Sequence, residues 1–313
     1  MRKHAQAGTA YPSDGGEATE NKAKITVLTH GSFIGKRFDI APDGTLAKTS
    51  QATFYNGTAR VVDAPDAAAL VGILNRLTPH DVVILGVLKH GRTEAPIKTA
   101  RHAAAGDATR SLDHFEHRSG EGWLLLDHDT KTMPVDVGAR VDTLGGGVKA
   151  IEHIWPELVD AERVMKPSSS GGVYTEGQEP SVATGFHLSA LVADVSKSKD
   201  ILDRLMARAW GAGLAWFTIS KSGALLERAI IDAAVAGPER LVFTAPPKLG
   251  PGVYRDAPAI QWQHGDVLDI PDQPHGNTWH QNKMAARRRM AGEAAQVRAE
   301  YIGKQADKLA KDT

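Results

Sequence analysis

The sequence has no cysteine, no excess of charge of either sign and no long apolar run. Its 313 residues contain 37 Lys and Arg against 37 Asp and Glu, so the formal net charge is zero. The missing cysteine excludes a disulfide-stabilised scaffold, a thiolate nucleophile and a cysteine-ligated zinc site. The neutral balance argues against a simple polybasic nucleic-acid binder. Because no apolar run approaches about 18 residues, we expect no membrane partner.

The composition is that of a globular protein and predicts a mixed α+β chain. Apolar residues make up 42% and charged residues 24% of the sequence. Residues 1–22 are polar and contain no apolar signal-peptide core, which predicts a disordered leader and fits a cytoplasmic protein. Residues 23–275 are expected to form one mixed α/β catalytic core. Residues 276–313 are polar and Ala-rich, which predicts a helical C-terminal extension or linker.

Periodicity separates the expected strands from the expected helices. Apolar or alternating runs predict strands at residues 24–30, 59–63, 81–88, 122–129, 163–166, 185–192, 214–220, 224–231 and 240–244. Helical spacing predicts helices at residues 65–77, 134–155, 198–211 and 281–311, the second interrupted by Gly145–Gly147. Residues 89–120 are polar and ambiguous.

The neutral total hides two segments of opposite charge. Residues 111–160 are acidic, whereas residues 281–313 are basic and include Arg287, Arg288 and Arg289. Each segment is either a solvated helix face or a functional surface. For the basic tail the alternatives are contact with a nucleic-acid backbone and a solvated helix that leads to a further domain.

Two carboxylates end the sharpest strand pattern of the chain. The apolar run Leu124–Leu126 is followed by Asp127 and Asp129, and alternate residues of a strand project from one face. Neighbouring carboxylates repel unless a cation lies between them, and oxygen ligands suit Mg²⁺ or Mn²⁺. The pattern predicts a divalent-metal site, with a turn of solvated acids as the alternative.

A second pattern combines a histidine with loops rich in serine and glycine. Ser181 and His187 belong to the stretch SVATGFH, and His187 lies near the start of an expected strand. A histidine in this setting donates to a phosphate, as do loop hydroxyls and backbone N–H groups. The alternative is an ordinary core or surface histidine. The nearby loop 167–172 (PSSSGG) is either a flexible surface loop or one that contacts nucleotide or template.

A third acid follows another apolar stretch. Asp232 ends LLERAIID, as Asp127 ends its own strand, and could complete a cradle of three carboxylates. Arg240 begins a further expected strand and could reach a phosphate. Taken alone, the pair could equally be a capping aspartate and a surface arginine.

In this order, the three patterns resemble the archaeo-eukaryotic primase superfamily, in particular its plasmid- and phage-type primase-polymerases. The resemblance rests on WLLLDHD at residues 123–129, on the serine and histidine of residues 181–187, and on LLERAIID and PERLVF within residues 225–243. It covers residues 120–250 closely and the N-terminal strands loosely. It implies the archaeo-eukaryotic primase fold, in which an N-terminal α/β unit and a modified RRM-like sheet hold the active site in the cleft between them.

The resemblance also implies an activity and roles for single residues. The activity is template-directed nucleotidyl transfer on DNA by a two-metal mechanism, as primer synthesis, DNA polymerisation or both. The ligands of two Mg²⁺ or Mn²⁺ ions would be Asp127, Asp129 and Asp232. His187 would act with these acids in catalysis, and the residues that bind the incoming nucleotide would be Ser181, His187, Arg240 and Lys248.

One departure from the family pattern bears on phosphate binding. Some members carry basic residues between the serine and the histidine, where this chain has Val182–Thr184. The phosphate contacts must then come from elsewhere, and the candidates are Arg163, Lys166, Arg228, Arg240 and Lys248.

The implied partners are a single-stranded DNA template, a primer, dNTP or NTP substrates and a helicase domain or protein. The implied setting is plasmid or phage replication in the cytoplasm of a bacterial host. Two other functions remain open on the sequence. An inert DNA-binding replication initiator of the same fold would bind DNA without incorporating nucleotides. A metal-dependent nuclease would cleave it.

Overall fold

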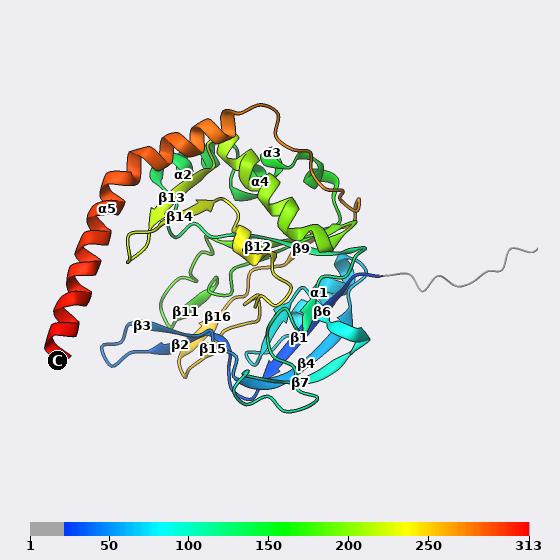
Figure 1. The fold of residues 1–313 in the computed structure, drawn as a ribbon. Helices are drawn as coiled ribbons and strands as arrows, with labels where there is room; N and C mark the ends of the chain where they lie inside the picture. Colours follow the sequence, from blue (N-terminus) through cyan, green and yellow to red (C-terminus); the bar gives the residue numbers. More distant parts are fainter. Residues whose placement is uncertain (1–21, 313) are drawn as a thin grey trace, which may run out of the picture.

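The computed structural model describes residues 22–312, so the leader expected at residues 1–22 lies, apart from Lys22, outside the described residues. Within that range the chain has a mixed α+β architecture built on two four-stranded antiparallel sheets (Figure 1). None of the helices in this part of the chain combines the length and the apolar character that a bilayer crossing requires.

The first sheet is formed by the N-terminal part of the chain. Its strands in spatial order are β5 (Asp81–Ile84), β1 (Lys24–His30), β4 (Asn56–Asp63) and β7 (Glu94–Lys98). Helix α1 (Ala67–Arg76) is capped by Asp66, whose carboxylate accepts from the Ala69 N–H at 2.8 Å. The expected strand at residues 81–88 is two strands, β5 and β6 (Val87–Leu88), and β6 pairs with β8 (Phe115–Glu116).

The second sheet lies at the centre of the molecule. Its strands in spatial order are β17 (Gln261–Gln263), β10 (Arg163–Pro167), β12 (Phe186–Val192) and β9 (Gly122–His128). Alternate residues of β9 enter different cores, with Leu126 in one and Trp123 and Leu125 in the other. Both faces of this sheet are therefore covered, which explains why β9 is apolar almost throughout.

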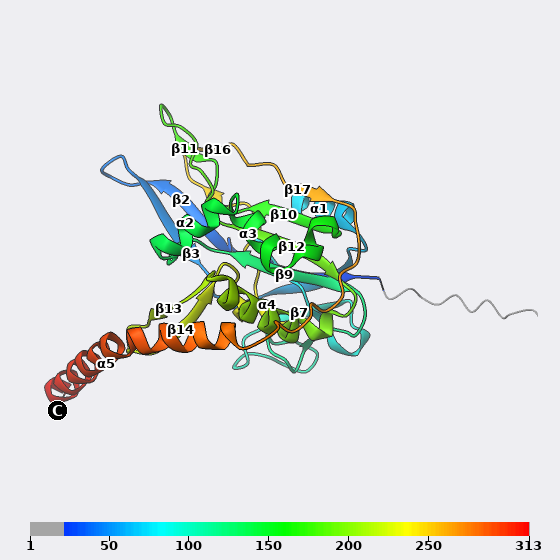
Figure 2. The same ribbon diagram turned by 90° about the horizontal axis from the view of Figure 1, so that it is seen from above.

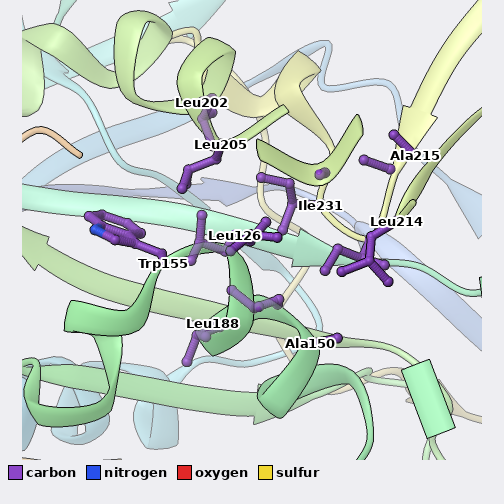
Figure 3. Packing of buried hydrophobic residues seen from close by; sticks show 14 of the residues in the cluster. Leu126, Ala150, Trp155, Leu188, Leu202, Leu205, Leu214, Ala215 and Ile231 are labelled. Carbon is purple, nitrogen blue, oxygen red and sulfur yellow. The ribbon is translucent and has the colours of Figure 1, made fainter. Parts of the chain in front are cut away.

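Helices cover one face of the central sheet, and the first sheet with α1 covers the other. The helices are α2 (Val135–Thr143), α3 (Gly147–Ile154) and α4 (Ser198–Ala212). Figure 3 shows Leu126 and Leu188 of the sheet packed with Leu202 and Leu205 of α4 and with Trp155. The break between α2 and α3 falls at the glycines, as the sequence predicts.

Besides the β6–β8 pair, the described residues form three smaller sheets. They consist of β13 (Ala215–Ile219) with β14 (Leu225–Ala229), of β11 (Val173–Thr175) with β16 (Val253–Arg255), and of β15 (Lys248–Leu249) with β2 (Gly35–Ile40) and β3 (Leu46–Gln51). The sequence does not predict β2 or β3. The strand expected at residues 240–244 is reduced to one bridge between Val242 and Val83, because the rest of that segment has no strand beside it.

The expected C-terminal helix is present as α5 (Thr278–Asp312), and its first part packs on the body of the protein. Ala286 and Ala294 are buried there, against α4 and β13. In both views α5 and the β2–β3 hairpin extend from the same side of the molecule (Figures 1 and 2).

Gly223, in the turn of the β13–β14 hairpin, sets how closely α5 approaches. Its φ is +77°, and a Cβ there would lie 2.6 Å from both the Ala294 carbonyl oxygen and the Arg298 nitrogen. Gly223→Ala is expected to lower the free energy of unfolding by about 1–3 kcal/mol, through backbone strain and displacement of α5. Chemical denaturation measures this change.

A glycine within α5 is the matched control for Gly223. A Cβ at Gly292 meets no atom within 4 Å, so Gly292→Ala should stabilise the protein by about 0.5–1 kcal/mol. Equal effects of the two substitutions would contradict the assigned close approach at Gly223.

Candidate functional site

The three acids singled out in the sequence meet at the end of β9. Asp127 is the penultimate residue of the strand, and Asp129 follows its end. Asp232 follows β14, and its backbone N–H donates to the carbonyl oxygen of Asp127 at 3.0 Å. This backbone bond joins the two segments and brings Asp232 beside Asp127 and Asp129, from which it is far apart in the sequence.

The surroundings of Asp127 reflect the closeness of the acids. Burial first, and then the negative charges of Asp232 and Asp129, together raise the pKa of Asp127 to about 6. Lys36 acts in the opposite direction but does not offset these causes. The side chain of Asp127 is 28% exposed, so solvent still reaches the carboxylate. The site concentrates negative charge that a cation would stabilise.

Local hydrogen bonds orient the other two acids. The Oδ1 atom of Asp129 accepts from the Lys131 N–H at 2.9 Å, and that of Asp232 accepts from the Ala234 N–H at 2.9 Å. Arg228 Nη1 lies 4.0 Å from Asp232 Oδ1. Among the described residues, no three His, Asp or Glu side chains are placed closely enough to hold a metal ion. The carboxylates are neighbours but do not form a coordination sphere as they stand.

His187 lies beside Asp127 on the neighbouring strand. The two residues are cross-strand partners in β12 and β9, and His187 Nε2 is 3.6 Å from Asp127 Oδ1. Burial first, and then the charges of Lys36 and Lys166, together lower the pKa of His187 to about 4. His187 is therefore neutral at pH 7, and its ring can donate only one hydrogen bond at a time.

Lys36, which the sequence patterns did not single out, lies between the acids and loop 167–172. Its Nζ atom donates to Ser168 Oγ at 3.0 Å and to Ser170 Oγ at 3.2 Å. Burial and the charge of Lys48 lower the pKa of Lys36, whereas Asp129 and Asp127 raise it. Loop 167–172 therefore lies beside the candidate site, and its contact with nucleotide or template stays a prediction.

Two more cations surround His187 and this loop. Lys166, the cross-strand partner of His187, donates to the Leu74 carbonyl at 3.3 Å, and burial lowers its pKa to about 8, with a smaller contribution from Arg255. Arg255 Nε donates to the Gly171 carbonyl at 3.0 Å. We call Lys36, Lys166 and Arg255 the basic cluster. Three half-buried cations with few acceptors among them favour binding of an anion.

Ser181 shapes the loop. Its hydroxyl donates to the Ser170 carbonyl at 2.9 Å and accepts from the Val173 N–H at 3.0 Å. These bonds hold residues 170–173 against the start of the 181–187 stretch. The predicted contact between Ser181 and a phosphate stays a prediction, and the hydroxyl proton is already engaged in the loop.

Other basic candidates from the sequence lie apart from the basic cluster. Arg163 pairs with Glu152 at 2.8 Å. Arg240 is exposed and lies 3.6 Å from Glu239, and Lys248 lies 5.7 Å from the centre of the Phe33 ring. Their predicted phosphate contacts stay predictions. His128, between the two acids, is buried, stacks on Phe186 and bonds to a carbonyl, so its role is structural.

Comparisons with protein-family models, with curated proteins and with solved structures found no match for this chain. The structure itself shows a mixed α+β protein. Its candidate site places three acids beside a histidine and a cluster of three cations.

Proposed function

We propose that the protein catalyses template-directed nucleotidyl transfer on DNA, as primer synthesis, polymerisation or both. The observation that carries the proposal is the juxtaposition of three acids with a basic cluster across His187. Nucleotidyl transfer from a nucleoside triphosphate needs both groups. The cations would contact the anionic phosphates, and the acids would hold the metal ions that help the attacking hydroxyl to lose its proton. The basic cluster supplies the phosphate contacts that the sequence between Ser181 and His187 lacks.

The finer fold proposed is that of the archaeo-eukaryotic primases. In support, β9 is followed by helices α2 and α3, then by β10, β12 and α4, with β12 lying between β10 and β9. This order agrees with the central part of an RRM-like βαββα unit. The first sheet would supply the N-terminal α/β unit, and we propose the expected setting of plasmid or phage replication in a bacterial cytoplasm.

The donor set at the end of β9 fits Mg²⁺ or Mn²⁺. Asp127, Asp129 and Asp232 would hold two such ions, since all their ligand atoms are carboxylate oxygens, and burial together with the charges of Asp232 and Asp129 raises the pKa of Asp127. When bound, the ions supply a lowered pKa for the attacking 3′-hydroxyl and charge stabilisation at the leaving pyrophosphate.

The residues on the other side of Asp127 would bind and orient the triphosphate. Lys36 and Lys166 offer ammonium donors, and Arg255 offers a guanidinium. Neutral His187 would donate one hydrogen bond to a phosphate oxygen, and it gains a proton more readily once a phosphate is near. The hydroxyls of Ser168 and Ser170 would complete the phosphate contacts after Lys36 turns from them.

A direct assay separates the proposed function from its alternatives. The full chain is incubated with single-stranded template, with and without a primer, with each labelled dNTP or NTP and Mg²⁺ or Mn²⁺. We expect incorporation of the nucleotide that complements the template. Binding without incorporation would indicate an inert replication initiator, and shortening of the DNA would indicate a nuclease. Incorporation that ignores the template would also contradict the proposal.

The basic face of α5 is a candidate contact for the DNA backbone. Lys283, Arg287 and Arg298 line a groove between α5 and the β13–β14 hairpin, whose Arg228 lies beside Asp232. Replacing Arg287 and Arg298 by Gln should reduce the slope of log affinity against log salt by about 1.4, for two lost phosphate contacts on a single strand. Fluorescence anisotropy over a salt series measures the slope.

Two exposed arginines on the other side of the protein serve as the control. Arg60 on β4 and Arg76 on α1 are exposed, and their replacement by Gln should leave the slope unchanged. An equal change in both double variants would show a general charge effect instead of a site on α5. Deletion of residues 281–313 is a poorer test, because Ala286 and Ala294 belong to the packed part of the fold.

A further inference from the structure

Two tyrosines pair across the small sheet formed by β11 and β16, which we call the β11–β16 sheet. Tyr174 and Tyr254 are cross-strand partners, with ring centroids 5.7 Å apart and ring planes inclined by 33°. Tyr254 is 49% exposed, and Tyr174 is half-buried. On the opposite face of the sheet, Val173 and Val253 are buried against Phe38 of β2. The valines thus anchor the sheet, and core packing does not account for the exposed ring of Tyr254.

The pair is continuous with the candidate site. Arg255 follows Tyr254 and bonds to the carbonyl of Gly171, in the loop whose serines accept from Lys36. The Asp256 N–H donates to the Gly172 carbonyl at 2.8 Å. A strand of nucleic acid that leaves the site over this loop would therefore reach the outer face of the β11–β16 sheet next.

The charges around the tyrosines indicate which part of such a strand they would meet. Asp256 lies 3.5 Å from the Tyr174 hydroxyl, and Glu176 and Glu179 follow β11 and are exposed. These acids disfavour a phosphate backbone at this position. An aromatic face stacks with any base and needs no positive charge, and such stacking is the common way to hold single strands.

We propose that Tyr174 and Tyr254 form a stacking platform for the bases of single-stranded DNA beside the site. This inference rests on the proposed function, which supplies the reason for a single strand there. Stacking on the platform does not depend on which base is bound, because every base has an aromatic face. The platform contributes to affinity through contact with the base and not with the phosphate. Its contribution to affinity should therefore depend little on salt, unlike that of the arginines on α5.

The test is binding of a labelled oligothymidylate to the full chain, without nucleotide or divalent cation, at low and high salt. Tyr254→Ala should weaken binding by about 5-fold or more at both salt concentrations, since stacking contributes about 1–3 kcal/mol per base. Tyr254→Leu should weaken it similarly, because it lacks an aromatic face. Tyr254→Phe should bind like the unchanged protein.

Tyr55, which is 56% exposed and lies outside the β11–β16 sheet, provides the matched control, and Tyr55→Ala should have no effect. Unchanged binding by Tyr254→Ala would overturn the proposal. So would equal weakening by Tyr254→Phe, which would implicate the hydroxyl, or full rescue by Tyr254→Leu, which would implicate apolar contact. Thermal unfolding of each variant confirms that the exposed substitution leaves the fold intact.

Different experimental outcomes would reject the platform and the proposed function. Tyr254-dependent binding by a protein that incorporates no nucleotide keeps the platform and rejects nucleotidyl transfer. Normal incorporation by a protein whose binding does not depend on Tyr254 rejects the platform alone.

Discussion

Asp127→Asn is expected to lower nucleotide incorporation by about a thousandfold or more, because a ligand that would hold two cations loses its charge. The backbone bond from Asp232 to residue 127 does not depend on the side chain, so the variant should fold. Incorporation on a primed template with Mg²⁺ or Mn²⁺ measures the loss. The control is Asp203→Asn on α4, because this exposed carboxylate pairs with Lys199 and is not one of the three acids of the site.

The same substitution should stabilise the protein when no divalent cation is present. The pKa of Asp127 is about 6 in the folded protein and 3.8 in its ordinary state, so folding favours the protonated carboxyl. Stability is therefore lost as pH rises from about 4 to about 6, by roughly 2–3 kcal/mol, and Asn removes this loss. Denaturation of both proteins in chelator at pH about 4 and about 7 measures the difference.

Two results would contradict this account of Asp127. Undiminished incorporation by Asp127→Asn would reject its catalytic role. Equal stability changes at the two pH values would show that burial and the charges of Asp232 and Asp129 do not raise the pKa of Asp127 in the folded protein.

Lys36→Ala should raise the KM for the nucleoside triphosphate by about 10- to 100-fold, because one charged hydrogen bond contributes about 1.5–3 kcal/mol. The effect on kcat should be smaller, since Lys36 does not approach the attacking hydroxyl in the proposed arrangement. Direct binding of nucleoside triphosphate and of nucleoside, measured by calorimetry, separates loss of phosphate contacts from a general disturbance. Only the triphosphate should bind more weakly.

Arg37 is the matched control for Lys36. It is the next residue of β2, projects from the other face and pairs with Asp39 at 2.6 Å. Arg37→Ala perturbs the same strand without touching the site, so its KM should stay within about twofold of the unchanged protein. If both variants lose affinity equally, the effect comes from the hairpin and the phosphate contact of Lys36 is rejected.

The sequence predicts best those segments whose burial decides their structure. Strands β1, β9 and β12 are apolar runs, and α4 shows a regular apolar face, so each was expected close to its observed bounds. The hairpin β2–β3 was not expected, because Phe38 is its only fully buried residue within the described part of the chain. A strand held by one buried side chain leaves almost no periodic signal.

The candidate site also contains residues that the sequence predicts and residues that it does not. The three acids each end an apolar stretch, so the sequence marks them and their order, and the structure brings them together. Lys36 and Arg255 lie in polar segments without a motif, and only the tertiary fold places them beside His187 and loop 167–172. The side-chain bonds of Ser181 to that loop likewise depend on the observed turn and could not be predicted from its spacing.

The bond between Lys36 and Ser168 has a consequence for how the protein is made. It joins residues 132 positions apart, and Arg255 is added to the cluster only after most of the chain has been synthesised. Contacts of such long range form late, because they close large loops of unfolded chain. The opposite charges of the site therefore come together only when the N-terminal, central and C-terminal parts of the chain are all in place. A nascent or partly folded chain would expose Asp127 and Asp129 without the lysines and the arginine that the complete protein places beside them.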